Sequence, residues 1–242
     1  MPTIYIGTAG WSIPRDQQHQ FPSGDSHLAR YARVLPAVEI NSTFYRPHRA
    51  ATFERWAATV PRSFRFSVKV PSAITHDQRL RNSARLLDAF LADLEPLGRK
   101  LGCLLVQLPP SLPFEPRVAR AFFSVLRRRF AGGVAIEPRH VSWFHSRAAQ
   151  VLVEHGVARV AADPPRAEGG GDPGGWPGLA YFRLHGSPRM YYSAYEDSFL
   201  DPLAERLRRL ARRRIPAWCI FDNTTLGAAM PNALAVLGGL RR

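Results

Sequence analysis

The sequence has few cysteines and no long apolar run. Its two cysteines, Cys103 and Cys219, both lie in apolar, strand-like stretches, and no CxxC or Cys/His zinc spacing occurs. This excludes a disulfide framework and is typical of a protein from a reducing compartment. No stretch of about 18 apolar residues is present, so no membrane span is expected. The first residues resemble a strand more than a signal peptide, and we expect a cytoplasmic protein with no membrane partner.

Lysine is also scarce. Of the 33 lysines and arginines only Lys69 and Lys100 are lysines, which leaves 31 arginines, and the net charge is +14. A positive excess of this size favours polyanionic partners such as nucleic acid. A genome whose base composition favours arginine and alanine codons would produce the same excess of positive charge. Arginine runs such as 127–129 and 212–214 would then lie on solvated helix faces. The composition leaves both explanations open.

Apolar runs bounded by turn residues recur along the chain and predict eight strands. The expected strands are 3–11, 37–44, 64–71, 102–110, 133–140, 157–164, 179–186 and 216–223. Segments with helical periodicity separate most of them, at 27–35, 51–60, 83–94, 116–130, 146–156 and 199–213, with another at 231–240. Eight strands that alternate with helices in 242 residues predict an α/β fold, a single TIM-like (β/α)8 barrel domain over residues 1–242.

One connection departs from the alternation. Residues 164–178, which follow the sixth expected strand, are rich in glycine and proline and cannot form a normal helix. We therefore expect a loop in place of the helix after strand six, either mobile over the barrel mouth or a plain connector. A doubly wound open sheet is the alternative fold, but no GxGxxG motif follows the first strand.

Several expected strands alternate between polar and apolar residues. In the seventh, Tyr181, Arg183 and His185 alternate with Phe182 and Leu184, and the second, third and fifth behave similarly. Successive side chains of a strand point to opposite faces. We expect the aromatic and branched side chains to face the helices and the polar ones to face the barrel interior.

The polar residues gather at the carboxyl ends of the strands, where barrel enzymes have their active sites. These positions are Trp11, Glu39, Asn41, Lys69, Gln107, Glu137, Arg139, His140, Asp163, Arg183, His185, Asp222 and Asn223. The pattern predicts a functional site at this end. A purely structural network of arginines and carboxylates is the alternative.

Seven motifs in these regions resemble the YecE-like family, a bacterial and archaeal domain of unknown function. They are "IGTAGWS" (6–12), "VEINSTFYR" (38–46), "FSVKVP…ITH" (66–76), "LGCLLVQLPPS" (101–111), "IEPRHVSWF" (136–144), "YFRLHG" (181–186) and "FDNTTLGAAMPNA" (221–233). The resemblance covers essentially the whole chain and implies a TIM-like barrel, but it implies no reaction. Pro138 stands where members commonly have Phe, and the segment 13–22 also departs from the family pattern.

Four residues are candidates for catalysis. Glu39 and Glu137 are the types that form an acid–base pair, and His185 can move a proton. Lys69 can bind an anion, act as a base or form a Schiff base. An ion pair of Lys69 with Glu39 or Glu137 is the structural alternative.

The remaining candidates would bind substrate. Arg139 and Arg183 can clamp a phosphate or carboxylate, unless each pairs with a glutamate of the protein. Polar strand-end residues would add contacts: Asn41, Gln107, His140, Asp163, Asp222 and Asn223. The rim would be formed by Trp11, Tyr45, Trp143, Arg189 and Tyr191, which suit a ring-shaped or phosphorylated ligand, although such aromatic residues also serve packing.

The same end of the barrel carries side-chain types that bind divalent metals: Glu39, Glu137, Asp163, His185 and Asp222. Lys69, Arg139 and Arg183 would repel a cation there, so we assign no metal ligand and leave the cofactor unknown. The leading hypothesis is a hydrolase or lyase that binds a phosphorylated or otherwise anionic ligand, such as a sugar phosphate or nucleic acid. The alternatives are a non-catalytic nucleic-acid-binding protein and a metal-dependent phosphoesterase.

Overall fold

Strands and helices alternate along the computed structural model, which describes residues 4–241. The strands are β1 (Ile4–Thr8), β2 (Ala37–Ile40), β3 (Arg65–Lys69), β4 (Leu101–Gln107), β5 (Gly133–Glu137), β6 (Ala158–Arg159), β7 (Ala161–Asp163), β8 (Gly174–Gly175), β9 (Ala180–Leu184) and β10 (Ala217–Phe221). The α-helices are α1 (His27–Ala32), α2 (Ala50–Thr59), α3 (Ala84–Leu94), α4 (Pro116–Arg127), α5 (Ser146–Glu154), α6 (Asp197–Arg212) and α7 (Ala229–Arg241). Residue 3, part of the first expected strand, lies outside the described residues.

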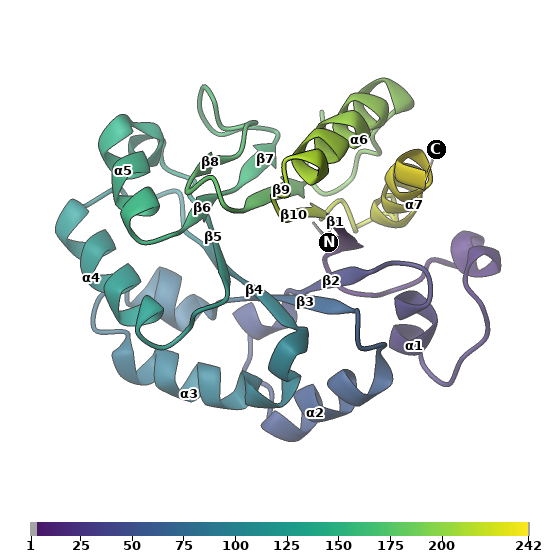
Figure 1. Cartoon of the computed structure of the whole chain (residues 1–242), viewed down its shortest axis with the longest axis horizontal. Helices are drawn as coiled ribbons and strands as arrows, with labels where there is room; N and C mark the ends of the chain where they lie inside the picture. The colour runs from purple at the N-terminus through teal and green to yellow at the C-terminus, as the bar shows by residue number, and fades with distance from the viewer. Residues whose placement is uncertain (1–3, 242) are drawn as a thin grey trace.

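The strands form two sheets. One has the order β1-β10-β9-β7 and the other β2-β3-β4-β5-β6-β8. Every pairing is parallel except that of β6 with the two-residue β8. The helices lie on the outer side of the strands (Figure 1). The prediction of an α/β fold with parallel strands is confirmed.

The two sheets approach each other at β1 and β2. Ala9 forms an isolated parallel bridge with Glu39, and the amide of Gly10 donates to the carbonyl oxygen of Glu39 at 2.9 Å. Nearer the start of both strands, the Tyr31 hydroxyl accepts from the amide of Thr8 at 2.9 Å and donates to the carbonyl of Ala37 at 2.9 Å. A side chain thus supplies the hydrogen bonds that a continuous backbone ladder would otherwise provide here.

The sixth expected strand, 157–164, is not continuous, and this part of the prediction is wrong. Its first half, β6, pairs with β5, whereas its second half, β7, pairs with β9 of the other sheet. Val160 lies between them, and its amide donates to the carbonyl of Ile136 at 2.8 Å. The interruption arises because the chain leaves one sheet here and joins the other.

The two faces of the strands pack as the alternating pattern predicted. Phe66 and Val68 belong to the larger apolar core together with residues of the surrounding helices. Leu105, Tyr181 and Trp218 belong to a separate, smaller core. One face of the strands therefore packs against the helices, and the other forms a second core in which small residues such as Ala135 lie among larger ones.

The glycine-rich and proline-rich segment 164–178 packs against the neighbouring sheet. No helix occurs between β7 and β9, whose connection lies wholly within the described range, and β8 pairs with β6. The amide of Trp176 donates to Val157 at 2.8 Å, and that of Ala162 to Gly170 at 3.0 Å. These backbone hydrogen bonds support the expectation that the segment is a plain connector, and not a loop that moves over the strand ends.

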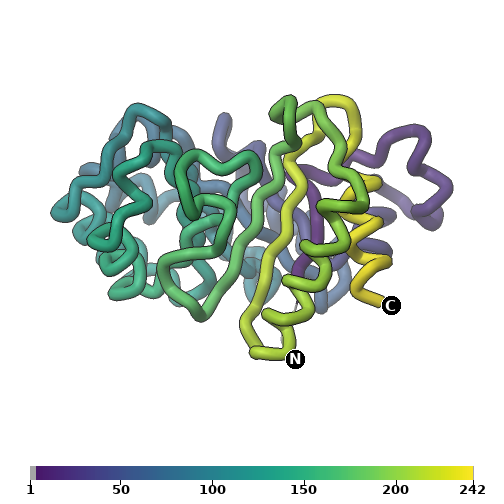
Figure 2. The backbone as a smooth tube through the Cα atoms, turned by 90° about the horizontal axis from the view of Figure 1, so that it is seen from above, coloured from purple at the N-terminus to yellow at the C-terminus, as the bar shows by residue number. Residues whose placement is uncertain are grey.

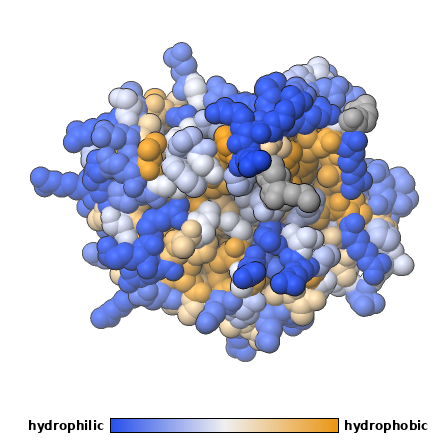
Figure 3. Space-filling view, in the orientation of Figure 1, coloured by the Kyte–Doolittle hydropathy of each residue, from blue (hydrophilic) through white to orange (hydrophobic). Residues whose placement is uncertain are grey.

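Both termini of the described chain lie on the side formed by β1, α6 and α7 (Figures 1 and 2). Hydrophilic side chains cover much of the face seen in Figure 3, with apolar patches between them. Within residues 4–241, no helix has both the length and the apolar character needed to cross a bilayer.

Replacing Gly7 should destabilise the approach of β1 to β2. A Cβ at Gly7 would lie 2.1 Å from the carbonyl oxygen of Ala37. Because backbone atoms must move to relieve this clash, Gly7→Ala should lower the free energy of unfolding by about 2 kcal/mol. In Gly238→Ala the new methyl meets nothing within 4 Å in helix α7, so this control should gain about 0.5 kcal/mol. Urea denaturation measures both, and equal effects would contradict the steric role of Gly7.

Candidate functional site

A buried arginine lies at the centre of the strand ends. Arg183, on β9, donates from Nε to Glu39 at 3.0 Å, from one terminal nitrogen to Glu137 at 3.0 Å, and from the other to Glu39 at 2.8 Å. That last nitrogen also lies 3.0 Å from Asp222. The planar guanidinium has five N–H donors in a fixed geometry, which suits one cation among three carboxylates.

His185 connects two of these carboxylates. Its Nε2 lies 2.8 Å from Glu137 and its Nδ1 lies 3.0 Å from Asp222. Each ring nitrogen therefore faces a carboxylate oxygen. Arg139 adds a second guanidinium, 2.9 Å from Glu137. We call Arg183, Glu39, Glu137, Asp222, His185 and Arg139 the Arg183 network.

The network holds Glu137 and Asp222 in their ionised form. Burial by itself would raise the pKa of Glu137, but Arg183, His185 and Arg139 lower it well below its usual range. Burial likewise opposes ionisation of Asp222, yet Arg183 and the hydrogen bond from His185 lower its pKa. Glu137 is therefore a poor proton donor near neutral pH.

A tyrosine links the network to the apolar core beneath it. The Tyr181 hydroxyl donates to Glu39 at 2.9 Å and lies 2.9 Å from the hydroxyl of Ser67. Its ring stacks on Trp218 with centroids 6.0 Å apart. Tyr181 was not among the predicted site residues, although its position two residues before Arg183 on the same strand face was the signal that could have identified it.

Lys69 differs from the other buried charged groups at this end. It is 4% exposed, and among the described residues its ammonium nitrogen has neither a hydrogen-bond partner nor a carboxylate within 4.0 Å. The alternative of an ion pair with Glu39 or Glu137 is therefore wrong. The nitrogen instead lies over the ring of Phe44, 4.0 Å from its centroid. Burial, and then the charge of Arg183, lower the pKa of Lys69 to about 8 against the opposing effect of the carboxylates.

His76 lies beside Lys69 and was also absent from the predicted site. Its ring meets the edge of the same Phe44 ring, with centroids 4.9 Å apart. Burial, followed by the positive charge of Lys69, lowers the pKa of His76, with a further contribution from Arg139. Nδ1 lies 2.9 Å from the Thr75 hydroxyl. The "ITH" motif (74–76) was the available sequence signal.

Two of the predicted binding residues, Trp143 and His140, make local structural contacts. Trp143 is 1% exposed, donates from its indole nitrogen to Leu112 at 3.0 Å, and packs on Phe114. His140 accepts from the amide of Ser142 at 3.2 Å and so caps the short helix at 141–144. Neither side chain is needed to complete the Arg183 network.

Two of the polar residues predicted to bind substrate, Asp163 and Asn223, hold loops in place. Asp163 accepts from the Tyr195 hydroxyl at 2.8 Å. Asn223 is fully buried and donates to Ser193 at 2.9 Å and Asn232 at 3.0 Å. These contacts secure the segment after β9 against the start of α7, and they place both residues outside the network itself.

The rim candidates lie at different depths. Tyr191 is 37% exposed, and its ring meets the edge of His185 at 5.6 Å. Tyr45 is 75% exposed, with its ring centroid 6.0 Å from the Lys69 nitrogen. Trp11 packs on Trp56 with centroids 4.9 Å apart. Arg189 stacks on a neighbouring ring, that of Tyr192, at 3.8 Å.

Three buried polar atoms at this end lack partners within the part of the chain that the structure describes. One of them is Oδ1 of Asn223, whose amide nitrogen holds the loop, and the other two lie nearer the network. These two are Nε of Arg139 and Oδ1 of Asn41. Gln107, the last residue of β4, is half-buried opposite Glu137 in the strand register. Buried polar atoms without partners are uncommon in proteins and mark positions where a ligand or water would be stabilised.

The whole chain matches a known family. A model described as "Protein of unknown function DUF72" matches residues 5–242. The chain belongs to the DUF72 family. It is 33% identical over 168 residues to the UPF0759 protein YecE of Escherichia coli K12, a match that covers 66% of this chain and 59% of that protein. It is 24% identical to the UPF0759 protein YunF of Bacillus subtilis, over 97% and 93% of the two chains.

Solved DUF72 structures share the fold. One from Enterococcus faecalis superposes with a TM-score of 0.82 at 24% identity, covering 99% of this chain and 96% of that one. One from Thermotoga maritima gives 0.81 at 27% identity, covering 99% and 100%. The chain spans about half the length of the E. coli proteins it matches. The resemblance to YecE-like proteins is confirmed, and these names assign no reaction.

The donor set of this DUF72 chain does not favour a metal at the centre of the network. Among the described residues, no group of three or more His, Cys, Asp or Glu side chains is arranged to hold a metal ion. Glu39, Glu137 and Asp222 instead converge on Arg183. The guanidinium thus occupies the position between the carboxylates that a cation would need.

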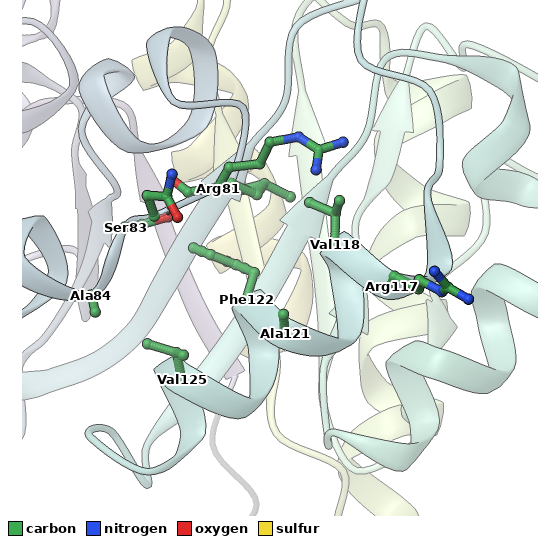
Figure 4. Close-up of a pocket in the computed structure, with 10 residues that line it drawn as sticks. Arg81, Ser83, Ala84, Arg117, Val118, Ala121, Phe122 and Val125 are labelled. Carbon is green, nitrogen blue, oxygen red and sulfur yellow. Dashed lines mark hydrogen bonds between the residues drawn. The ribbon is translucent and has the colours of Figure 1, made fainter.

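A separate pocket of about 520 Å³ lies between the start of α3 and helix α4. Val118, Phe122 and Val125 line it, and Arg81 and Arg117 lie at its edge (Figure 4). It contains none of the predicted site residues. Because its lining is mainly apolar and contains none of these residues, we place the candidate site at the Arg183 network.

Replacing Glu137 should leave buried cations without a counter-ion. Glu137→Gln should lower the free energy of unfolding at pH 7 by about 3 kcal/mol or more. Glu115→Gln, which removes an exposed partner of Arg81, should cost less than about 1 kcal/mol. Urea denaturation followed by circular dichroism measures both, and equal losses would show that the network contributes no more than a surface pair.

The network should also make the protein sensitive to acid. Because the pKa values of Glu137 and Asp222 are lower in the folded protein than in the unfolded chain, their stabilisation is present above about pH 4.3, the ordinary glutamate value, and is lost as the pH falls below it. Denaturation curves from pH 7 to pH 3 should show a steeper loss for the native sequence than for Glu137→Gln. Parallel pH profiles would contradict this origin of the acid sensitivity.

Proposed function

We propose that this DUF72 protein is an enzyme, a lyase or hydrolase, which binds a small anionic ligand at the carboxyl ends of its strands. In this proposal the two sheets together make a single TIM-like (β/α)8 barrel, with β6 and β7 sharing one strand position and β1 beside β2. The bridge from Ala9 to Glu39 supports that arrangement. Parallel barrels of this kind carry their active sites at the end where the Arg183 network lies.

The observation that carries the proposal is a buried lysine with no direct carboxylate partner, beside a buried guanidinium nitrogen with no acceptor. Lys69 has no carboxylate partner within the described residues, and the Nε of Arg139 is buried without an acceptor. Burying a cation without a counter-ion costs several kcal/mol. A site built only for stability would not retain this cost, whereas an anionic ligand would remove it.

The roles of the predicted catalytic residues differ in this proposal from those expected from sequence alone. Glu39 accepts from both Tyr181 and Arg183 and is fully buried. We therefore assign Glu39 and Glu137 to positioning Arg183 and Arg139. Lys69 is then the group that contacts the ligand. His185 joins Glu137 to Asp222, and its ring contacts the ring of Tyr191.

Two other functions stay as predictions. A nucleic-acid-binding protein would use the general excess of arginine and would not depend on Lys69. A metal-dependent phosphoesterase would need carboxylate oxygens that Arg183 now engages, so the arrangement supports it less well. The experiment below separates both from the proposed enzyme.

Anion binding should depend on Arg139 and Lys69. At about 100 times its Kd, a ligand that binds only the folded protein adds about 2.7 kcal/mol of stability. In a thermal-shift screen of inorganic phosphate, pyruvate, sugar phosphates, divalent metals and short oligonucleotides, we expect a small anion to stabilise the native sequence. Arg139→Gln and Lys69→Met should each weaken this binding about tenfold or more, because each removes a charged contact.

Arg117→Gln is the matched control, because it removes an arginine from the separate pocket between α3 and α4. It should leave the shift unchanged. If Arg117→Gln alone abolishes the shift, the anion binds in that pocket and the proposed site is wrong. Stabilisation by oligonucleotides only, equal in all variants, would favour the nucleic-acid-binding protein.

A further inference from the structure

We propose that Lys69 is a nucleophilic amine that forms an imine with a small carbonyl compound bearing an acidic group. This inference rests on the proposed function and narrows it from an anionic ligand to a class of substrate. It also favours a lyase over a hydrolase, because a protonated imine withdraws electrons from the neighbouring carbon atoms and so assists cleavage of a bond beside them.

The surroundings of Lys69 are those of a reactive amine rather than a structural one. A structural lysine is held by acceptors, as Lys100 is: its nitrogen donates to the carbonyl oxygens of Ala57 at 2.5 Å and Val60 at 2.7 Å. The Lys69 nitrogen has no acceptor within residues 4–241, and its contact is the face of the Phe44 ring. Its lone pair is therefore not committed to another group once the proton leaves.

Charged groups from several elements act on this amine. They are Arg183, which disfavours the charge of Lys69, and Glu39, Glu137 and Asp222, which favour it. The ring of His76 contacts the same Phe44 ring as the amine. Burial is the largest effect and lowers the pKa of Lys69 to about 8. An amine with this pKa is partly neutral near physiological pH, whereas an ordinary lysine, with a pKa of about 10.4, is almost wholly protonated.

The chemistry needs no oxidant or reductant. The neutral amine adds to the carbonyl carbon, forming a C–N bond while the carbonyl oxygen becomes a hydroxyl. The second proton of the amine nitrogen then passes to that hydroxyl, the C–O bond breaks, and water leaves as the C=N bond of the imine forms. His76 is placed to move the protons: Nδ1 lies beside the Thr75 hydroxyl, and Nε2 has no partner among the described residues. Burial, and then the positive charge of Lys69, lower the pKa of His76, which favours the neutral ring that can accept a proton.

The acidic group of the substrate would meet Arg139. Its side chain is 7% exposed, one terminal nitrogen lies 2.9 Å from Glu137, and its buried Nε lacks an acceptor. A carboxylate or phosphate on the substrate would supply that acceptor. The ring of Tyr45, largely exposed and near the Lys69 nitrogen, marks the side from which such a molecule would approach.

The scarcity of lysine makes the inference directly testable, since Lys69 and Lys100 are the only lysines. The full chain would be incubated with pyruvate or dihydroxyacetone phosphate and sodium cyanoborohydride, which reduces an imine to a stable secondary amine. Intact mass spectrometry would count adducts, and peptide mapping would separate Lys69 from Lys100 and the α-amino group. Lys69→Met and Lys100→Met are the matched variants.

We expect one adduct at Lys69 in the native sequence and in Lys100→Met, and none at that position in Lys69→Met. Its rate of formation should reach half of its maximum near pH 8. Arg139→Gln should slow the reaction with pyruvate about tenfold, but should leave the reaction with glyceraldehyde, which has no acidic group, nearly unchanged. If Lys69→Met fails to fold, mapping of the native chain still decides the site.

Three results would contradict the inference, and they can be distinguished from one another. If pyruvate stabilises the protein through Lys69 and Arg139 but no adduct forms at Lys69, the anion site stands and imine formation is wrong. If neither binding nor an adduct depends on Lys69, both the inference and the proposed function are wrong. Labelling of Lys100 as fast as Lys69 would also contradict a specially reactive amine.

Discussion

The attachment of Arg183 to three carboxylates is the interaction on which the rest of the site depends. The carboxylates come from three separate parts of the chain, Glu39 on β2, Glu137 on β5 and Asp222 just after β10. One guanidinium therefore joins both sheets. Removal of any one partner would leave a buried charge uncompensated, so the strand ends are electrostatically coupled to one another.

Around this centre, the same buried environment has opposite effects on different groups. Glu137 and Asp222 remain ionised because cations surround them, whereas Lys69 is easier to deprotonate because burial and Arg183 both disfavour its charge. The paired carboxylates thus lie near one amine that has no direct partner among the described residues. Enzymes shift the pKa values of reactive groups by combining burial with neighbouring charge in this way.

Much of the arrangement could be predicted from local patterns. The alternation of Tyr181, Arg183 and His185 with apolar residues predicted that these side chains share a face, because strand geometry has a period of two. The pattern could not predict which acid each arginine contacts. It also suggested that Trp143 and Asn223 line a ligand site. In the structure Trp143 fills the core and Asn223 holds a loop. The pattern failed here because aromatic and amide side chains serve packing as readily as binding.

The sequence by itself determined the family, the order of strands and helices, and the end of the strands where polar groups gather, since each depends on motifs and periodicity along the chain. Only the tertiary structure decided that Val160 divides the sixth expected strand between two sheets, that Arg183 is fully paired, and that Lys69 is not. Those features depend on distances between residues far apart in the chain. Burial and pairing of charge, unlike secondary structure, are properties of the folded assembly of strands.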